Sequence, residues 1–297
     1  MRRRILAPLA LLLLAALITT AAPGTAAQAA TRSPTYYVSL GDSYSVGVQP
    51  NAGSTPGYTV YVARHTGLTL VNFGCGGATT SSILNLVGCP DVLPDTAGGV
   101  TYPTTTQIAA AQAFLTAHRG HIGLITVSIG ANDVTACATQ ANPIPCVGTA
   151  VNNIKANVTT LAADLRAAAG PNVPIIGSTY PDVILGGYVW PHNPPAASTV
   201  NAAKLSVAAF KLLINPALSK AYASSDGSLV DVTAATGAYG SLTTTVNTKT
   251  YGTIPVPVAS VCALTWFCEL GNIHARTPGY TLIGKLIVVR YHSVTRR

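Results

Sequence analysis

The stretch Gly41–Ser43 places an acid and a hydroxyl directly after an alternating apolar run that ends at Leu40. Three interpretations are open: an ordinary turn, a loop that binds phosphate, or a catalytic serine. A phosphate loop needs more glycines and a lysine at fixed spacing, and no lysine is near. A serine hydroxyl is a weak nucleophile, so the catalytic interpretation requires a base from elsewhere in the chain.

Three further polar, glycine-flanked stretches could contribute to such a site. They are residues 72–79, which include Gly77, residues 130–133, which include Asn132, and residues 271–280, which include His274. Each alone is a weak indication, because such residues commonly form turns and helix starts. Together they are more informative, because all of them follow predicted strands except the last, which precedes the final predicted helix.

The elements that must position these residues alternate along the chain. Strands are predicted over 36–40, 68–73, 124–129, 174–179 and 229–232, and helices over 58–65, 105–118, 151–165, 205–213 and from 277 past 286. This alternation predicts an α/β fold with a parallel sheet covered by helices on both faces. Ligands of such sheets bind outside the carboxyl ends of the strands. Residues 238–261 are rich in Thr, Gly and Pro and are predicted to form a long surface excursion.

Residues 1–30 have the order of a secretory signal peptide: three arginines, an apolar run from Ile5 to Ile18, and a small-residue end. The apolar run is shorter than the ~20 residues of a membrane span. We therefore expect cleavage after Ala29 or Ala30, an extracellular protein without a stable membrane anchor, and one domain over residues 31–297.

The charge of the chain does not indicate a nucleic-acid partner. The formal net charge is +8, and three of these charges lie in the predicted signal peptide. No basic stripe is interleaved with aromatic residues, so binding of nucleic acid is not expected. We also expect a monomer.

The six cysteines fall in three close sequence pairs. An exported protein meets an oxidising compartment, where disulfides persist. Local pairing is the simplest of the possible connectivities, and it joins Cys75 to Cys89, Cys137 to Cys146 and Cys262 to Cys268. Zinc is less favoured, because no CxxC occurs and no histidines cluster nearby. We therefore expect no metal and no cofactor.

The four blocks GDSY, the Gly77 block, GAND and the histidine block resemble those of the SGNH/GDSL hydrolases, and most closely the secreted actinobacterial esterases and lipases. The resemblance covers nearly all of residues 31–297. It implies a three-layer α/β/α, flavodoxin-like sandwich with a central parallel sheet. It also implies that Ser43 is the nucleophile and His274 its base. The implied oxyanion donors are the backbone N–H groups of Ser43 and Gly77 and the side chain of Asn132.

One position departs from the family pattern. The family usually has aspartate three residues before the histidine, and this chain has Gly271 there. We expect a backbone carbonyl near Gly271 to hold the histidine, as in some family members, with a distant carboxylate as the alternative. Glu269 is near, but its spacing does not fit. Asp42 is interpreted as structural, shaping the turn after the strand.

The resemblance also points to Tyr180–Asp182 as a wall of the substrate pocket. The aromatic loop Tyr188–His192 follows it, although such loops more often serve packing.

The leading functional hypothesis is a secreted serine esterase or lipase that hydrolyses carboxylic esters. One alternative is a carbohydrate esterase that removes acetyl groups from a polysaccharide. Another is a non-catalytic binding protein that kept the fold, which only Gly271 favours. Fold alone does not settle the substrate.

Overall fold

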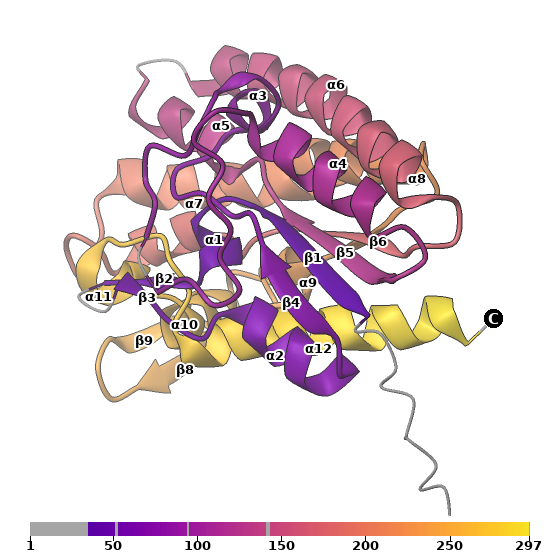
Figure 1. The fold of residues 1–297 in the computed structure, drawn as a ribbon. Helices are drawn as coiled ribbons and strands as arrows, with labels where there is room; N and C mark the ends of the chain where they lie inside the picture. Colours follow the sequence, from indigo (N-terminus) through magenta and orange to yellow (C-terminus); the bar gives the residue numbers. More distant parts are fainter. Residues whose placement is uncertain (1–34, 51–52, 94, 141–142, 297) are drawn as a thin grey trace, which may run out of the picture. The chain divides into compact units, whose positions relative to one another are not determined.

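The structure is a computed structural model that describes residues 35–50, 53–93, 95–140 and 143–296 (Figure 1). The predicted signal peptide, residues 1–30, lies outside the described residues, so its prediction stays untested.

A five-stranded parallel sheet forms the centre of the fold (Figure 1). Its strands are β4 (Thr69–Asn72), β1 (Tyr36–Gly41), β5 (Ile122–Ser128), β6 (Ile175–Ser178) and β7 (Ser228–Val230), in that spatial order. Counted in chain order, the parallel strands run 2-1-3-4-5, which is the flavodoxin-like order. The strand order reverses between β1 and β5, and ligands bind at such a switch point.

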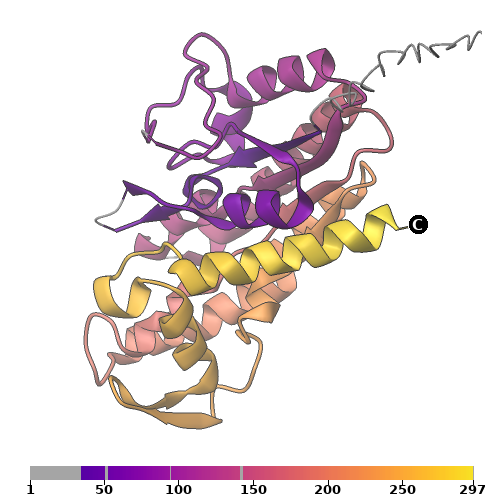
Figure 2. The same ribbon diagram turned by 60° about the horizontal axis from the view of Figure 1, so that its bottom comes forward.

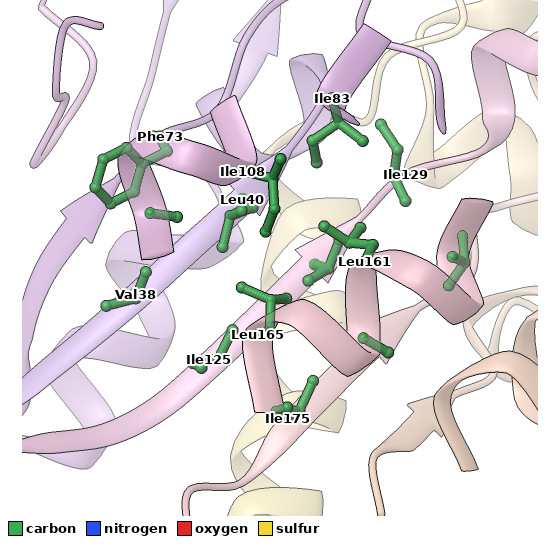
Figure 3. Packing of buried hydrophobic residues seen from close by; sticks show 14 of the residues in the cluster. Val38, Leu40, Phe73, Ile83, Ile108, Ile125, Ile129, Leu161, Leu165 and Ile175 are labelled. Atoms are coloured by element: carbon green, nitrogen blue, oxygen red, sulfur yellow. The ribbon is translucent and has the colours of Figure 1, made fainter. Parts of the chain in front are cut away.

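Helices cover both faces of the sheet, which makes three layers (Figures 1 and 2). The main helices are α2 (Tyr58–Thr66), α3 (Thr80–Asn85), α4 (Gln107–Ala117), α6 (Pro143–Ala169), α7 (Ala197–Ala209), α8 (Asn215–Ala223) and α12 (Thr277–Thr295). Val38 and Leu40 pack with α4 and α6 on one face (Figure 3). Tyr37 packs with α2 and α12 on the other, because successive strand residues point to opposite faces. The predicted α/β sandwich is therefore confirmed.

The remaining elements are short and lie between these. They are α1 (Ser43–Val46), β2 (Val48–Gln49), β3 (Gly53–Ser54), α5 (Ala131–Thr135), η1 (Ala136–Thr139), η2 (Val183–Tyr188), η3 (Phe210–Ile214), α9 (Val232–Ala235), β8 (Thr245–Thr248), β9 (Gly252–Pro255), α10 (Val256–Leu264) and α11 (Phe267–Leu270).

Two segments differ from their predictions. Residues 238–261 are not a plain surface excursion: they form the β8–β9 hairpin and most of α10, and Ile254, Val258 and Val261 pack in a third apolar cluster. Their Thr, Gly and Pro content hid a short alternating strand pair. The helix predicted over 205–213 is part of a longer helical run, Ala197–Ala223, in which η3 is a π-helical turn.

The three disulfides join Cys75 to Cys89, Cys137 to Cys146 and Cys262 to Cys268. This confirms the local pairing, and no cysteine in the described part of the chain is free. Such pairing is compatible with an extracellular protein.

Candidate active site

Ser43 lies at the switch point, as the first residue of α1, which Asp42 alone separates from β1. Gly41 makes the turn possible. Its φ is +134°, and a Cβ at this position would overlap the carbonyl oxygen of Ser128 on β5. The backbone N–H of Asp42 donates to that same oxygen at 3.0 Å. Close approach of β1 and β5 therefore requires glycine here and holds Ser43 at the mouth of the sheet.

The Asp42 carboxylate stabilises this turn. It accepts a hydrogen bond from the Tyr44 backbone N–H at 2.9 Å and another from the Tyr180 hydroxyl at 2.5 Å. Burial raises the pKa of Asp42 to about 7, while these hydrogen bonds act in the opposite direction. The contacts match its interpretation as a structural residue.

Gln107, which the sequence analysis did not single out, clamps the end of β1 from α4. Its side-chain oxygen accepts from the Gly41 N–H at 2.8 Å, and its Nε2 donates to the Gly41 carbonyl at 3.1 Å. Gln107 is almost fully buried. A polar residue at the buried start of an apolar helix was the signal that could have found it.

The histidine loop reaches Ser43 through its neighbour Tyr44. The Tyr44 hydroxyl donates to the Ile273 carbonyl at 2.7 Å, and the Tyr44 and His274 ring centroids lie 6.2 Å apart. The loop pairs with residues 264–266: the Trp266 N–H donates to the His274 carbonyl at 3.0 Å. The structure thus brings together two segments from opposite ends of the chain.

Asn272 orients the histidine. Its Oδ1 accepts a hydrogen bond from the His274 backbone N–H at 2.9 Å and lies 2.8 Å from His274 Nδ1. The His274 backbone N–H shows which atom of the Asn272 amide faces the imidazole ring, because only the amide oxygen can accept its hydrogen bond. Nδ1 must therefore carry the proton and donate it, which leaves the lone pair of Nε2 free to act as a base.

The expectation that a carbonyl near Gly271 holds the histidine is wrong in this respect: the acceptor is the side chain of Asn272. An Asn that bonds the backbone two residues on is a common turn, and this spacing was the signal that the sequence analysis missed. Gly271 instead ends α11 with a φ of +63°, and a Cβ there would overlap the Trp190 indole. Glu269 pairs with Arg276 at 2.6 Å.

The other two blocks meet beside the turn at Gly41. The Cys75 N–H donates to the Gly41 carbonyl at 3.0 Å, which places the following Gly77 loop next to it. Gly77 has a φ of +69°, and no heavy atom lies within 4 Å of a Cβ built on it. It therefore borders open space, and its positive φ suits glycine.

Asn132 is the second residue of α5, the short helix after β5, and is tied to the Gly77 loop. Its Nδ2 donates to the Ala78 carbonyl at 2.9 Å, and the amide has a second N–H. The Asp133 carboxylate accepts from the Thr80 N–H at 2.9 Å and from the Thr80 hydroxyl at 2.5 Å. These bonds hold the two predicted oxyanion positions in one assembly.

Residues 39–242 match the family model of the GDSL-like lipase/acylhydrolase family. The chain belongs to this family. The match includes Ser43, Gly77 and Asn132 and ends before His274. No curated protein matches the sequence of this GDSL family member. Among solved structures it is similar to the salicylyl-acyltransferase SsfX3 from a tetracycline biosynthetic pathway, with a TM-score of 0.38 and 14% identity over 89% of this chain. The chain spans 57% of that protein, and the family assignment rests on the sequence match alone.

The electrostatics of this GDSL family member favour a neutral histidine. Burial lowers the pKa of His274 below its usual value of 6.5, and the nearby Asp91 carboxylate acts in the opposite direction. A neutral imidazole at pH 7 can accept a proton. Among the described residues, no three His, Cys, Asp or Glu side chains gather where they could hold a metal ion.

A cavity of about 400 Å³ lies beside the turn that carries Ser43 and the loop that carries His274. It starts at Tyr44 and Ile273, the neighbours of Ser43 and His274, and its walls are almost entirely apolar. Of the segment Tyr180–Asp182, Tyr180 and Pro181 line this cavity, and its role as a wall of the substrate pocket stays a prediction. Asp182 is buried behind the wall, bonded to the Ser206 hydroxyl at 2.8 Å. In the aromatic loop, Trp190 packs against Gly271.

Proposed function

We propose that this protein is a secreted serine esterase or lipase that hydrolyses carboxylic esters with apolar acyl chains. The observation that carries the proposal is the contact of Asn272 Oδ1 with His274 Nδ1, in a loop that Tyr44 ties to Ser43. It fixes the tautomer that a general base beside a serine needs.

In the proposed reaction, the Ser43 hydroxyl attacks the ester carbonyl while His274 Nε2 takes its proton. The imidazolium that forms keeps its Nδ1–H on Asn272. The oxyanion accepts hydrogen bonds from the backbone N–H groups of Ser43 and Gly77 and from the Asn132 amide. His274 then gives its proton to the leaving alcohol. In the second half of the reaction, His274 takes a proton from water, the hydroxide attacks the acyl-enzyme, and His274 returns the proton to Ser43 as the acid leaves.

The apolar cavity supports a fatty acyl chain over an acetylated polysaccharide. A sugar substrate presents many hydroxyl groups, and each needs a polar partner when water is removed. The cavity offers almost none and is large enough for an extended chain. The only argument for the non-catalytic alternative was the lack of an aspartate at position 271. Asn272 weakens that argument, because its side-chain oxygen accepts the hydrogen bond from His274 Nδ1.

The test is hydrolysis of a p-nitrophenyl ester series from acetyl to palmitoyl, alongside acetylated xylan. We expect the ratio kcat/KM to rise with acyl length until the cavity is filled, and xylan to release little acetate. A serine-directed phosphonate should label Ser43 and not the exposed Ser81, as read by peptide mass spectrometry. Faster release of acetate from xylan than from any soluble ester would favour the carbohydrate esterase, and the absence of labelling would contradict catalysis by Ser43.

A further inference from the structure

The mouth of the apolar cavity carries large hydrophobic side chains that face solvent. Leu205 (51% exposed), Leu212 (67%) and Leu213 (48%) lie on α7 and η3, and Ile144 (66%) lies at the start of α6. We call these four residues the rim. All of them line the cavity, so the exposed apolar surface is continuous with it. Contiguous exposed apolar surface of this kind is typical of a binding site rather than of ordinary surface.

The helical run that carries the three rim leucines has charged side chains of one sign only. Residues 197–223 contain Lys204, Lys211 and Lys220 and no Asp or Glu. The three lysines are exposed. Two Lys–Leu pairs, 204–205 and 211–212, repeat seven residues apart, which is about two helical turns, so the two pairs recur on the same side of the helix. A helix that combines exposed apolar residues with lysines and lacks acids is typical of binding in the plane of an anionic lipid surface.

The geometry excludes a membrane span by this helix in the folded protein. The run Ala197–Ala223 is the one helix of the described residues that is long and apolar enough to cross a bilayer. Its second half, however, supplies Leu218 and Tyr222 to the central core. Only the first half, with the rim leucines, is free to meet a lipid. The π-helical turn η3 separates the two halves and lines the cavity, and such turns are frequent at functional sites.

We propose that the rim docks the enzyme on the surface of an anionic lipid aggregate, so that an acyl chain passes from the lipid into the cavity. The proposal rests on the proposed ester hydrolysis for its purpose, but docking itself can be measured without catalysis. The rim leucines and Ile144 enter the acyl layer, and Lys204 and Lys211 meet the anionic headgroups.

The experiment measures partition of the protein, carrying Ser43→Ala so that the lipid stays intact, into vesicles of equal parts phosphatidylglycerol and phosphatidylcholine. We expect binding that weakens in phosphatidylcholine alone and in high salt, which screens the lysines. Leu212→Ser should weaken partition by about tenfold, the effect of losing one buried leucine. The matched control is Val289→Ser, equally exposed (69%) on α12, which covers the other face of the sheet (Figure 1).

The paired change Lys204→Gln with Lys211→Gln tests the charge. Each lysine near an anionic surface contributes a factor of roughly five, so the pair should lose tenfold or more of the binding. Neither lysine lines the cavity, so hydrolysis of a soluble short-chain ester should stay unchanged when Ser43 is present. The control pair is Lys249→Gln with Lys285→Gln, which are exposed elsewhere.

Absence of vesicle binding, or equal effects of the rim and control changes, would overturn the proposal. So would a dimer in analytical ultracentrifugation that Leu212→Ser dissociates, if vesicles then fail to bind, because the rim would be covered by a second copy. Failure of the proposed function has a different signature: vesicle binding would persist while Ser43→Ala left ester hydrolysis intact.

Discussion

The two sides of the candidate site are held in different ways. The Ser43 side is built on the sheet, with Gly41 pressed against β5 and clamped by Gln107. The His274 side is a loop, held by the Tyr44 hydroxyl on Ile273 and by pairing with residues 264–266. The family match follows this division, because it covers the first side and ends at residue 242.

The difference shows which parts of such a site tolerate change. On the Ser43 side the backbone passes so close to β5 that one residue type fits, and the glycine cannot be replaced without moving a strand. On the His274 side the proposed chemistry needs only an acceptor for the hydrogen on Nδ1. The side-chain amide of Asn272, two residues before the histidine, supplies this acceptor. A carboxylate three residues before it would supply one too, and would add a negative charge that the amide lacks.

The largest expected effect joins the two sides. Ser43→Ala and His274→Ala should each lower kcat by as much as roughly 10⁶-fold, the value for serine and histidine in a subtilisin triad. The double variant should be no worse than either single one, because the two act as a unit. Kinetics with a soluble ester and circular dichroism for folding give the measurement. Additive losses would mean that the two sides do not work in one step.

The next effect belongs to the Ser43 side. Asn132→Ala removes the proposed side-chain oxyanion donor and should lower kcat by roughly 10²–10³ with little change in KM. It also frees the Ala78 carbonyl, so the neighbouring Asp133→Asn serves as the structural control, since that change weakens the same assembly through Thr80. An equal loss of kcat in both variants would assign Asn132 a purely structural role.

The third effect tests the His274 side. Asn272→Ala removes a hydrogen bond to the ring and should cost about 10–100-fold in kcat. Asn272→Asp keeps both bonds and adds charge, so activity should hold and the acid limb of the pH profile should move to higher pH. Introducing the acid at the family position 271 is blocked by Trp190 and by the positive φ.

Glu269→Gln is the comparison for that test. Its carboxylate is already paired with Arg276, so we expect a loss below about tenfold, since exposed ion pairs contribute little. A thousandfold loss there, with Asn272→Ala near wild type, would show that a carboxylate and not Asn272 supports the histidine.

The sequence predicted the fold almost completely, because all five sheet strands are short apolar runs bounded by turns, and the parallel order follows from their alternation with helices. It also identified the blocks on the Ser43 side, where glycine marks the close approaches. It did not identify Asn272, Gln107 or Tyr44. The roles of Gln107 and Tyr44 depend on contacts with distant segments, at Gly41 and Ile273, and no local pattern names the partner of such a contact. Asn272 differs, because its contact with His274 is local and its spacing of two residues could have identified it.

The smallest effect concerns Asp91, which lies two residues after Cys89 of the Cys75–Cys89 disulfide. Its carboxylate occupies the space where a Cβ on Gly76 would lie, and it raises the pKa of His274 against the stronger effect of burial. The proposed base works only when neutral, so we expect kcat/KM to fall as the pH drops through the pKa of His274. Asp91→Asn removes the nearby negative charge and should lower that pKa further.

The acid limb of kcat/KM should therefore move to lower pH in Asp91→Asn, by roughly a few tenths of a pH unit, the scale of a solvent-screened charge. The plateau at high pH should stay unchanged, because the neutral base is then fully present in both proteins. Asp95→Asn, an exposed acid four residues further along the chain, is the control and should leave the limb in place. High salt should shrink the Asp91 effect, since it screens the interaction. A shift to higher pH, or equal shifts in the two variants, would show that Asp91 does not act on the histidine, and the His274 side would then depend on Asn272 alone.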